Sequence, residues 1–357
     1  KRIIKIQEEC ANKFGRKYFY NEKGKYAKLE WNSGFNFYHP DFENIWRNDL
    51  NFESKNMILY GAPGTGKTYS AEKIVKSRKD ILGNVEYEIV QFHPSYGYED
   101  FIEGIKPTGM TKGQMKFELK NGIFKQMCID AFKNLVDVAQ NNAKLKTYYF
   151  IADEVNRAEL SRVFGELLLC LEGDKRLRIE GGKVVGTMIK TQSSNLWTEN
   201  DVVVCIDDEG KPVVATEDNK DNWYFGVPEN IYFIGTMNDI DRSVDSFDMA
   251  LRRRFVWKKY RCDYDVVLEK YSEAENVDKY IEACEALNNH IVKDFGLSDS
   301  YELGHSYFMQ AKSLNNTELK RVWDERISPS LREYLRAQFA DAEIDKKLKD
   351  AQKTFQL

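Results

Sequence analysis

The chain has 357 residues and a nearly balanced charge, with 53 basic residues against 57 acidic ones. A net charge of −4 excludes a chain that is basic throughout and binds nucleic acid along its whole surface, although local basic faces are compatible with it. Hydrophobic residues make up 42% of the sequence, enough for a packed core. The length exceeds that of one average domain, so we expect about two or three domains.

The cysteines and histidines show no metal-binding spacing. The six cysteines are scattered without a C-x-x-C pair, and the four histidines lie far apart. A structural zinc site is therefore not expected, and reduced thiols in the cytoplasm are the simpler interpretation. The longest obvious apolar run, Leu167 to Leu171, is too short to span a membrane. No signal peptide is visible, but the chain begins at Lys1 rather than at a Met, which allows for a missing upstream segment.

The first 50 residues are rich in aromatic side chains that have no clean period. Aromatic residues in such a pattern are more often part of a core than a platform for a ligand. We therefore interpret residues 1–50 as the tail of an N-terminal region and a linker that packs against the next domain.

Residues 61–68 match the phosphate-binding pattern G-x-x-x-x-G-K-[ST] without a deviation. Residues 56–60 before them predict a buried strand and residues 69–75 after them a helix, which makes a chance match in a glycine-rich turn the weaker alternative. Such a loop points backbone N–H groups at an anion, while Lys67 can reach the β- and γ-phosphates and Thr68 can complete a Mg²⁺ shell. The expected nucleotide-binding residues here are Gly61, Ala62, Pro63, Gly64, Thr65, Gly66, Lys67, Thr68 and Tyr69.

From residue 51 to about 262, predicted strands alternate with predicted helices, which indicates an α/β fold with a parallel sheet wrapped by helices. After the first strand, further strands are expected at 87–92, 147–152 and 231–235, and a helix at about 123–139. A long polar stretch from 93 to 122 separates two of these elements. Because ligands bind beyond the carboxyl ends of the strands in such sheets, we expect all the chemical motifs there.

Between about residues 174 and 228 short β-like runs are separated by Gly- and Asp-rich turns, so we expect hairpins inserted into the core domain. The expected strands are 186–189, 202–206 and 212–215. Five basic residues of this segment are expected on a solvated surface, in preference to a contact with DNA or a partner. They are Lys175, Arg176, Arg178, Lys183 and Lys190.

The last part of the chain predicts helices only. They are expected at 266–287, at about 289–295 and at about 318–350. The predicted organisation is a linker region at 1–50, an α/β nucleotide-binding core at 51–262 and a small all-α lid domain at 263–357.

An apolar strand that ends in Asp153 and Glu154 is the second element with chemical meaning. Asp153 can join Thr68 in holding Mg²⁺, and Glu154 can polarise the water that attacks the γ-phosphate. An Asp-Glu pair after a strand is common by itself. When it follows a matching phosphate loop in the sequence, the Asp-Glu pair indicates a nucleoside triphosphatase.

A third polar group comes after the strand at 231–235, where Asn238 can hydrogen-bond the γ-phosphate or the attacking water. The alternative is an Asn that only caps a turn. A fourth group is the short segment 250–255, which holds three adjacent arginines that would be costly to bury unpaired. Arginines that stabilise the charge on a neighbouring subunit's triphosphate would explain this segment, and they require a ring or another head-to-tail assembly.

Together these stretches resemble the AAA+ motor domain and, within that superfamily, the McrB family, over about residues 51–335. The most specific stretch is the M-N-x-x-D signature at Met237–Asp241. Residues 91–101, 153–158 and 304–308 also resemble the family, and the last of these places His305 among the expected nucleotide-binding residues. The insertion after Gly173 is longer than the family pattern.

The resemblance implies a hexameric ring that uses GTP and Mg²⁺, with ATP as the alternative, and that couples hydrolysis to translocation on DNA. It also implies a separate nuclease subunit, McrC, that stimulates hydrolysis by acting at the M-N-x-x-D signature. Asn238 and Asp241 would position the attacking water, and Arg253 and Arg254 would act in trans. The family's DNA-reading domain lies upstream of the motor, so recognition of methylcytosine is not carried over to this chain.

Two other functions fit the residues. One is an ATP-dependent remodeller of a protein partner, similar to MoxR proteins, which nucleotide preference and gene neighbourhood would separate from a restriction motor. The other is a nucleotide-dependent switch that hydrolyses slowly. The intact set of polar and charged motif residues disfavours the switch.

Overall fold

The structure is a computed structural model that describes residues 54–111, 113–240, 249–336 and 338–355. Residues 53–357 form one compact unit. The expectations for residues 1–50 and for Asp241 lie outside the described residues. No helix in the described ranges is long and apolar enough to cross a bilayer.

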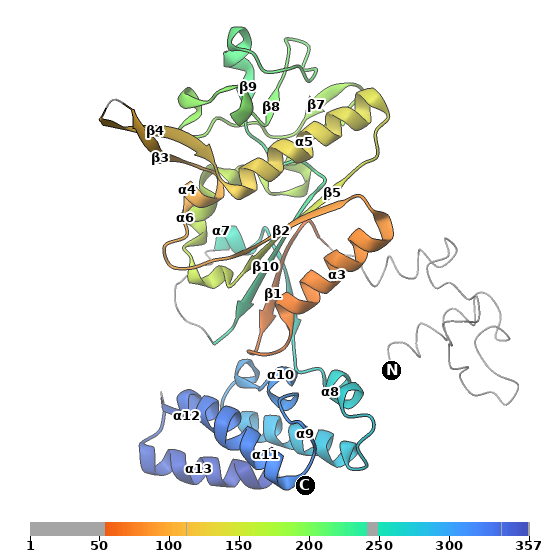
Figure 1. The fold of residues 1–357 in the computed structure, drawn as a ribbon, viewed down its shortest axis with the longest axis vertical. Helices are drawn as coiled ribbons and strands as arrows, with labels where there is room; N and C mark the ends of the chain where they lie inside the picture. Colours follow the sequence, from red (N-terminus) through yellow and green to blue (C-terminus); the bar gives the residue numbers. More distant parts are fainter. Residues whose placement is uncertain (1–53, 112, 241–248, 337, 356–357) are drawn as a thin grey trace, which may run out of the picture. The chain divides into compact units, whose positions relative to one another are not determined.

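A five-stranded parallel sheet forms the centre of the core, in the order β11-β1-β10-β5-β2 (Figure 1). The expected parallel sheet is confirmed, although β11 was not expected from the sequence. Its strands are β1 (Asn56–Gly61), β2 (Val85–Gln91), β5 (Thr147–Asp153), β10 (Ile231–Asn238) and β11 (Val256–Tyr260). Helices α3 (Lys67–Leu82) and α5 (Ile123–Asn141) pack against it.

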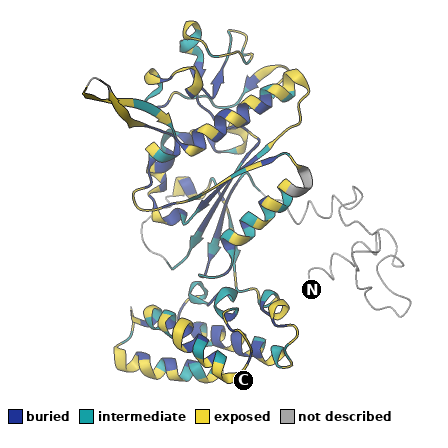
Figure 2. Ribbon diagram, viewed as in Figure 1, coloured by how far each residue is buried: buried dark blue, intermediate teal, exposed yellow. Residues whose placement is uncertain are grey.

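The inner strands form because their apolar runs are buried on both faces, as expected in a sheet covered by helices. Figure 2 shows this burial along the centre of the core. Phe150 of β5 and Phe233 of β10 stack with ring centroids 5.6 Å apart. Phe101 and Phe124 join them edge-on, so the two strands and the adjoining helices share one aromatic core.

The polar stretch from 93 to 122 is more structured than the sequence suggested. It contains α4 (Tyr98–Phe101) and an antiparallel hairpin of β3 (Glu103–Thr111) and β4 (Gln114–Asn121). The hairpin escaped prediction because both strands are largely polar and a bulge between Pro107 and Gly109 breaks the alternation that marks a strand.

The inserted segment contains hairpins, but two of the three expected strands are wrong. The pairs are β6 (Arg178–Glu180) with β7 (Lys183–Val185), and β8 (Val204–Cys205) with β9 (Trp223–Tyr224). Residues 186–189 and 212–215 contribute only isolated bridges, because short β-like runs pair by tertiary contact rather than by local pattern.

The expected solvated surface of the insertion is also wrong at one basic residue. Arg176 is 1% exposed and donates hydrogen bonds to backbone carbonyls and to Asn56. Burial lowers the pKa of Arg176 to about 10, so the guanidinium stays charged at neutral pH. A single charge in a basic run cannot be assigned to the core from sequence, because local polarity predicts solvent.

The C-terminal part is helical, as expected, and has its own apolar core around Tyr280, Leu287 and Trp323. The helix expected at 266–287 is interrupted between Lys270 and Val277, and the one expected at 318–350 is divided into several. The helices are α8 (Tyr264–Lys270), α9 (Val277–Lys293), α10 (His305–Phe308), α11 (Asn316–Val322), the π-helix η10 (Trp323–Ile327), α12 (Ser328–Arg336) and α13 (Asp341–Thr354).

Short helical turns complete the described chain. They are η3 (Val155–Arg157), α6 (Leu160–Phe164), η4 (Gly165–Cys170), η5 (Gly173–Lys175), η6 (Ser194–Leu196), η7 (Glu199–Asp201), η8 (Glu217–Asn222), α7 (Met249–Arg252) and η9 (Asp299–Tyr301). Five cysteines in the described ranges carry free thiols.

Candidate active site

The phosphate-binding loop joins the carboxyl end of β1 to the amino end of α3. Gly64 and Gly66 have φ angles of 75° and 69°, a left-handed conformation that glycine adopts without strain. Lys67 is 6% exposed, and its Nζ donates to the carbonyls of Gly61 at 3.2 Å and Ala62 at 2.8 Å. The ammonium group therefore lies within the curl of the loop, where a bound phosphate would meet it.

Three oxygen-bearing side chains converge next to this loop. The Thr68 Oγ1 donates to Asp153 Oδ1 at 2.6 Å, and the Thr236 Oγ1 donates to the same oxygen at 2.5 Å. Mg²⁺ prefers hard oxygen ligands and commonly takes one carboxylate together with phosphate oxygens. Thr68 and Asp153, the two residues expected to hold Mg²⁺, thus form a donor set that fits this ion, and Thr236 is a neighbour that was not expected from the sequence.

A chain of hydrogen bonds links the cation of the loop to the second carboxylate. Lys67 Nζ donates to Asn238 Oδ1 at 2.9 Å, and Asn238 Nδ2 donates to Glu154 Oε1 at 3.1 Å. Glu154 has φ 55°, which is uncommon for a residue with a side chain, and its Oε2 lies 3.5 Å from Nε of Arg157. The expected catalytic pair Asn238 and Glu154 is therefore brought together at the carboxyl edge of the sheet.

The predicted lid residues contact the phosphate loop directly. The backbone N–H groups of Gly304 and Ser306 donate to Pro63 O and Gly64 O, each at 3.0 Å. A Cβ added to Gly304 would lie 2.1 Å from the carbonyl carbon of Gly64, so only glycine allows this approach. His305, between them, lies over Gly66, within 2.9 Å of an added Cβ there.

The surroundings of His305 favour the neutral form of its imidazole. Its Nδ1 accepts a hydrogen bond from the backbone N–H of Asp263 at 3.3 Å, and burial lowers the pKa of the imidazole from its usual 6.5. A neutral ring at this position can donate from Nε2 toward the phosphate loop. The structure thus brings His305 to the site in which the family resemblance placed it.

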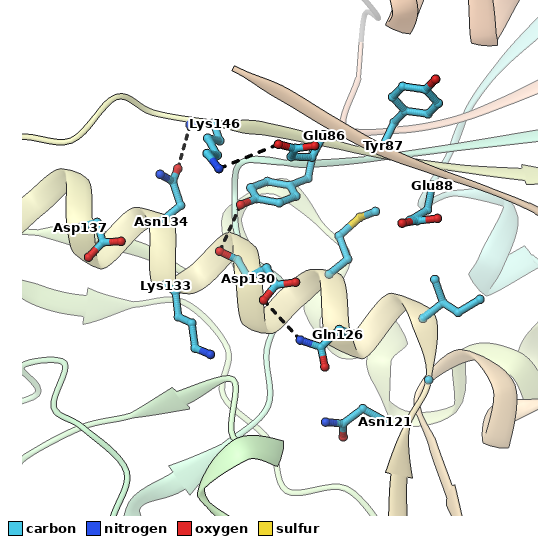
Figure 3. A pocket seen from close by; sticks show the side chains of 14 residues that line it. Glu86, Tyr87, Glu88, Asn121, Gln126, Asp130, Lys133, Asn134, Asp137 and Lys146 are labelled. Carbon is cyan, nitrogen blue, oxygen red and sulfur yellow. Dashed lines mark hydrogen bonds and ion pairs between the residues drawn. The ribbon is translucent and has the colours of Figure 1, made fainter. Parts of the chain in front are cut away.

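The cavity beside the loop has a volume of about 250 Å³ and is lined by loop residues together with Asp153, Glu154 and Asn238. Tyr69, an expected nucleotide-binding residue, lines it and is 67% exposed. A larger cavity of about 750 Å³ lies between β2 and α5 (Figure 3). Its lining contains acidic residues, with Lys146 3.9 Å from Glu86, and none of the motif residues. The chemistry of the lining residues, rather than the volume of the cavity, therefore identifies the candidate active site.

The arginine segment lies at the other edge of the sheet, which corrects the expectation that all the motifs gather at the carboxyl ends. Arg253 and Arg254 precede β11, and β11 runs parallel to β1 with Met57 opposite Val256. They therefore lie at the amino ends of these strands, whereas Gly61 begins the phosphate loop at the carboxyl end. Within one chain, the arginines and the phosphate loop occupy opposite edges.

A parallel α/β sheet, a phosphate loop, two carboxylates and a polar residue on the neighbouring strand define the class of P-loop nucleoside triphosphatases that carry a helical lid. Residues 56–255 match the family model of the AAA domain of the dynein-related subfamily, and residues 279–343 match that of the McrB alpha-helical lid domain. The chain belongs to the McrB family within the dynein-related AAA proteins, and it is a nucleotide-hydrolysing enzyme.

Two curated relatives come from restriction systems. The chain is 34% identical over 291 residues to the "Type IV methyl-directed restriction enzyme EcoKMcrB subunit" of Escherichia coli (strain K12), over 78% of this chain and 54% of that protein. It is 27% identical over 237 residues to the "Type II restriction enzyme BsuMI component YdiS" of Bacillus subtilis (strain 168), over 62% of this chain and 59% of that protein. The chain thus spans somewhat more than half the length of each.

Proposed function

We propose that this chain is the GTP-hydrolysing motor of a modification-dependent restriction system. In this proposal it assembles into a hexameric ring, works with a nuclease subunit of McrC type and couples hydrolysis to translocation on DNA. Residues 51–262 form the motor core, 263–357 the lid, and 1–50 a linker region. The names of both curated relatives place them in restriction enzymes, which supports the cellular role.

The observation that carries the enzymatic part is the continuous hydrogen-bond path from Lys67 through Asn238 to Glu154. Lys67 would bind the β- and γ-phosphates, and Glu154 would accept the proton of the attacking water as Asn238 orients it. Asp241 would join Asn238 in positioning that water. Lys67, Asn238 and Glu154 each have a role that their charge and their place in the path allow.

Thr68 and Asp153 would hold Mg²⁺, which neutralises charge on the phosphate oxygens when it is bound. Gly61 to Gly66 would direct backbone N–H groups at the phosphates, with Tyr69 and His305 bordering the nucleotide. Arg253 and Arg254 would complete the site of a neighbouring subunit, since they lie at the edge opposite their own phosphate loop.

The test is steady-state hydrolysis of GTP and ATP by the purified chain, alone, with DNA and with a nuclease subunit of McrC type. We expect GTP turnover to exceed ATP turnover and to rise when the nuclease subunit is added. ATP turnover well above GTP turnover would contradict the GTP assignment and favour the ATP-dependent remodeller. The particle mass with bound nucleotide, measured by light scattering, tests the hexamer separately.

A further inference from the structure

A short turn of the lid lies against the residue that follows Asn238. Asp239 comes directly after Asn238, the last residue of β10, and its Oδ2 accepts a hydrogen bond at 3.0 Å from the Oγ of Ser300 in η9 of the lid. Asp239 and Ser300 are both half-buried. The carboxylate of Asp239 is therefore engaged by the lid, although Asp239 belongs to the M-N-x-x-D signature of the core.

The backbone of Asp239 is held by the phosphate loop. Its N–H donates to the carbonyl of Gly61 at 3.2 Å, and Lys67 Nζ donates to the same carbonyl, also at 3.2 Å. Lys67 Nζ in turn donates to Asn238 Oδ1 at 2.9 Å. The side chain of Asn238 and the peptide group that follows it are thus both tied to the loop. Because Asn238 and Asp239 share a planar peptide bond, a shift of Asp239 moves Asn238 with it.

The lid turn is itself anchored by two cations of the core. The carboxylate of Asp299, next to Ser300, accepts from Lys259 Nζ at 2.6 Å on one oxygen and from Arg261 Nη2 at 2.7 Å on the other. The hydrogen bond from Lys259 lowers the pKa of Asp299 below its usual value, so the carboxylate is charged at neutral pH. Lys259 lies on β11 opposite Tyr60 of β1, so these ion pairs hold the turn beside the strand that leads into the phosphate loop.

The same stretch of lid reaches the phosphate loop four residues later, where Gly304 donates to Pro63 O. Leu303 before it is fixed to α9 by Asn288, whose Oδ1 accepts from the Leu303 N–H at 2.8 Å and whose Nδ2 donates to the Leu303 carbonyl at 3.0 Å. Asn288 is 3% exposed, and breaking these bonds would leave buried polar groups unpaired. We therefore expect residues 299–304 and α9 to move as one body.

We propose that Asp239 and Ser300 are positioning residues that make the placement of Asn238 depend on the lid. While the lid lies on the phosphate loop, Ser300 holds Asp239, and Asn238 is oriented toward the attacking water. When the lid moves away to release the product, the contact with Ser300 is lost and Asn238 loses that support. Hydrolysis is thereby confined to the state in which lid and loop enclose the nucleotide. This inference rests on the proposed function, because it takes the role of Asn238 from it.

The experiment compares single-turnover hydrolysis at saturating nucleotide with nucleotide affinity and Tm in the full chain. Ser300→Ala and Asp239→Ala should each lower the hydrolysis rate about 10- to 100-fold, the loss expected when a catalytic group is misplaced by about 1 Å. Affinity and Tm should stay close to those of the unmodified chain, because the backbone contacts between lid and phosphate loop remain. The matched control is Ser298→Ala, an exposed serine two residues before Ser300, which should change none of the three quantities.

Two conservative substitutions separate the hydrogen bond from the charge. Asp239→Asn keeps an oxygen that can accept from Ser300, and Ser300→Thr keeps a hydroxyl that can donate, so both variants should hydrolyse nucleotide at close to the unmodified rate. A loss in Asp239→Asn as large as that in Asp239→Ala, with Ser300→Ala unaffected, would show that the charge of Asp239 acts on the nucleotide site directly, and it would overturn the proposal.

A combination with Asn238→Ala tests whether the lid acts through Asn238. Asn238→Ala alone should lower the rate by about 10²-fold, and adding Ser300→Ala should lower it no further. If Asn238→Ala leaves the rate unchanged, the proposed role of Asn238 is wrong and this inference falls with it. If Asn238→Ala slows hydrolysis and Ser300→Ala does not, the role of Asn238 stands and only its dependence on the lid is refuted. Full additivity of the two losses would show that Ser300 acts by another route, which also contradicts the proposal.

Discussion

The two ends of the strands in the central sheet are built in different ways. The carboxyl ends, here called the carboxyl edge, carry the phosphate loop, and the amino ends, here called the amino edge, carry the arginine segment. At the carboxyl edge, most functional side chains come from a short motif at or just after the end of a strand, as with Lys67 after β1 and Glu154 after β5. At the amino edge, Asn56, Glu172, Arg176 and Arg254 come from separate parts of the chain and meet only in the fold. The first edge is organised for contact with a ligand, the second for holding a few residues in place.

This difference predicts that the two edges respond differently to substitution. Changes at Thr68, Asp153, Glu154 and Asn238 of the carboxyl edge should affect nucleotide chemistry and leave stability nearly unchanged, because these polar side chains are partly exposed. Changes in the buried network at the amino edge should lower stability, because they leave unpaired polar groups in the core.

The largest effect is expected from Glu154→Gln at the carboxyl edge. The amide cannot accept a proton from water, so turnover should fall by about 10³-fold, or about 4 kcal/mol of barrier, while nucleotide affinity and Tm stay close to those of the unmodified chain. Single-turnover hydrolysis and fluorescent-nucleotide binding measure the two quantities. The matched control is Glu159→Gln, an exposed residue of the same segment, and turnover equal to that control would remove Glu154 from its role.

The next effect tests the amino edge. Arg176→Met should lower the free energy of unfolding by about 3 kcal/mol, because Asn56 and the Leu171 carbonyl would lose a buried donor. Urea denaturation measures it, with Arg178→Met as the control, because its solvent-exposed pair with Glu180 should contribute little to stability. Equal costs for the two variants would show that the amino edge does not depend on its buried network.

A smaller effect is expected when the metal-binding donor set is altered. Thr68→Ala removes a hydroxyl that lies 2.6 Å from Asp153, and it should weaken nucleotide binding in Mg²⁺ on the order of 10- to 100-fold. Binding with Mg²⁺ chelated by EDTA should change little. Thr108→Ala, an exposed hydroxyl on β3, is the control, and a loss of affinity that is the same with and without Mg²⁺ would contradict the assignment.

The smallest effect concerns the lid contact and its dependence on pH. Because burial lowers the pKa of His305 below its usual 6.5, the folded chain binds that proton less readily than the unfolded chain. The stability contributed by the neutral ring is therefore present above pH 6.5 and is lost as the pH falls below that value. Melting temperatures at about pH 8 and about pH 5.5 should differ less for His305→Gln than for the unmodified chain. His93→Gln, an exposed histidine, should leave the difference unchanged, and an unchanged difference in His305→Gln would contradict the prediction.

Much of the carboxyl edge could be anticipated because its signals are local. The phosphate loop, the Asp153-Glu154 pair and Asn238 each come after an apolar run that forms a strand, and parallel strands bring their carboxyl ends together. Thr236 was missed, although it lies two residues before Asn238 on β10 and a hydroxyl residue near the carboxyl end of a strand is a usable signal. His305 was placed by resemblance alone, because nothing in its local pattern indicates a contact with Gly66.

The predictions from sequence that were wrong, or that missed an element, have a common physical origin. The β3–β4 hairpin is largely polar and carries a bulge, and the strands of the insertion are only two or three residues long, so neither shows a local pattern that marks a strand. Arg176 lies in a basic run that resembles solvated surface, yet its donors satisfy carbonyls that only the fold brings to it.

The class of site could be inferred from the amino-acid sequence alone, because strand, loop and helix succeed one another within a few residues and periodicity and motif spacing express them directly. How the residues of the amino edge are held together depends instead on long-range contacts in the folded chain. Arg176 and Asn56 are 120 residues apart, and Asn56 and Arg254 are 198 residues apart. No local pattern records such contacts, since they arise when the sheet brings the amino ends of β1 and β11 together with the base of the insertion.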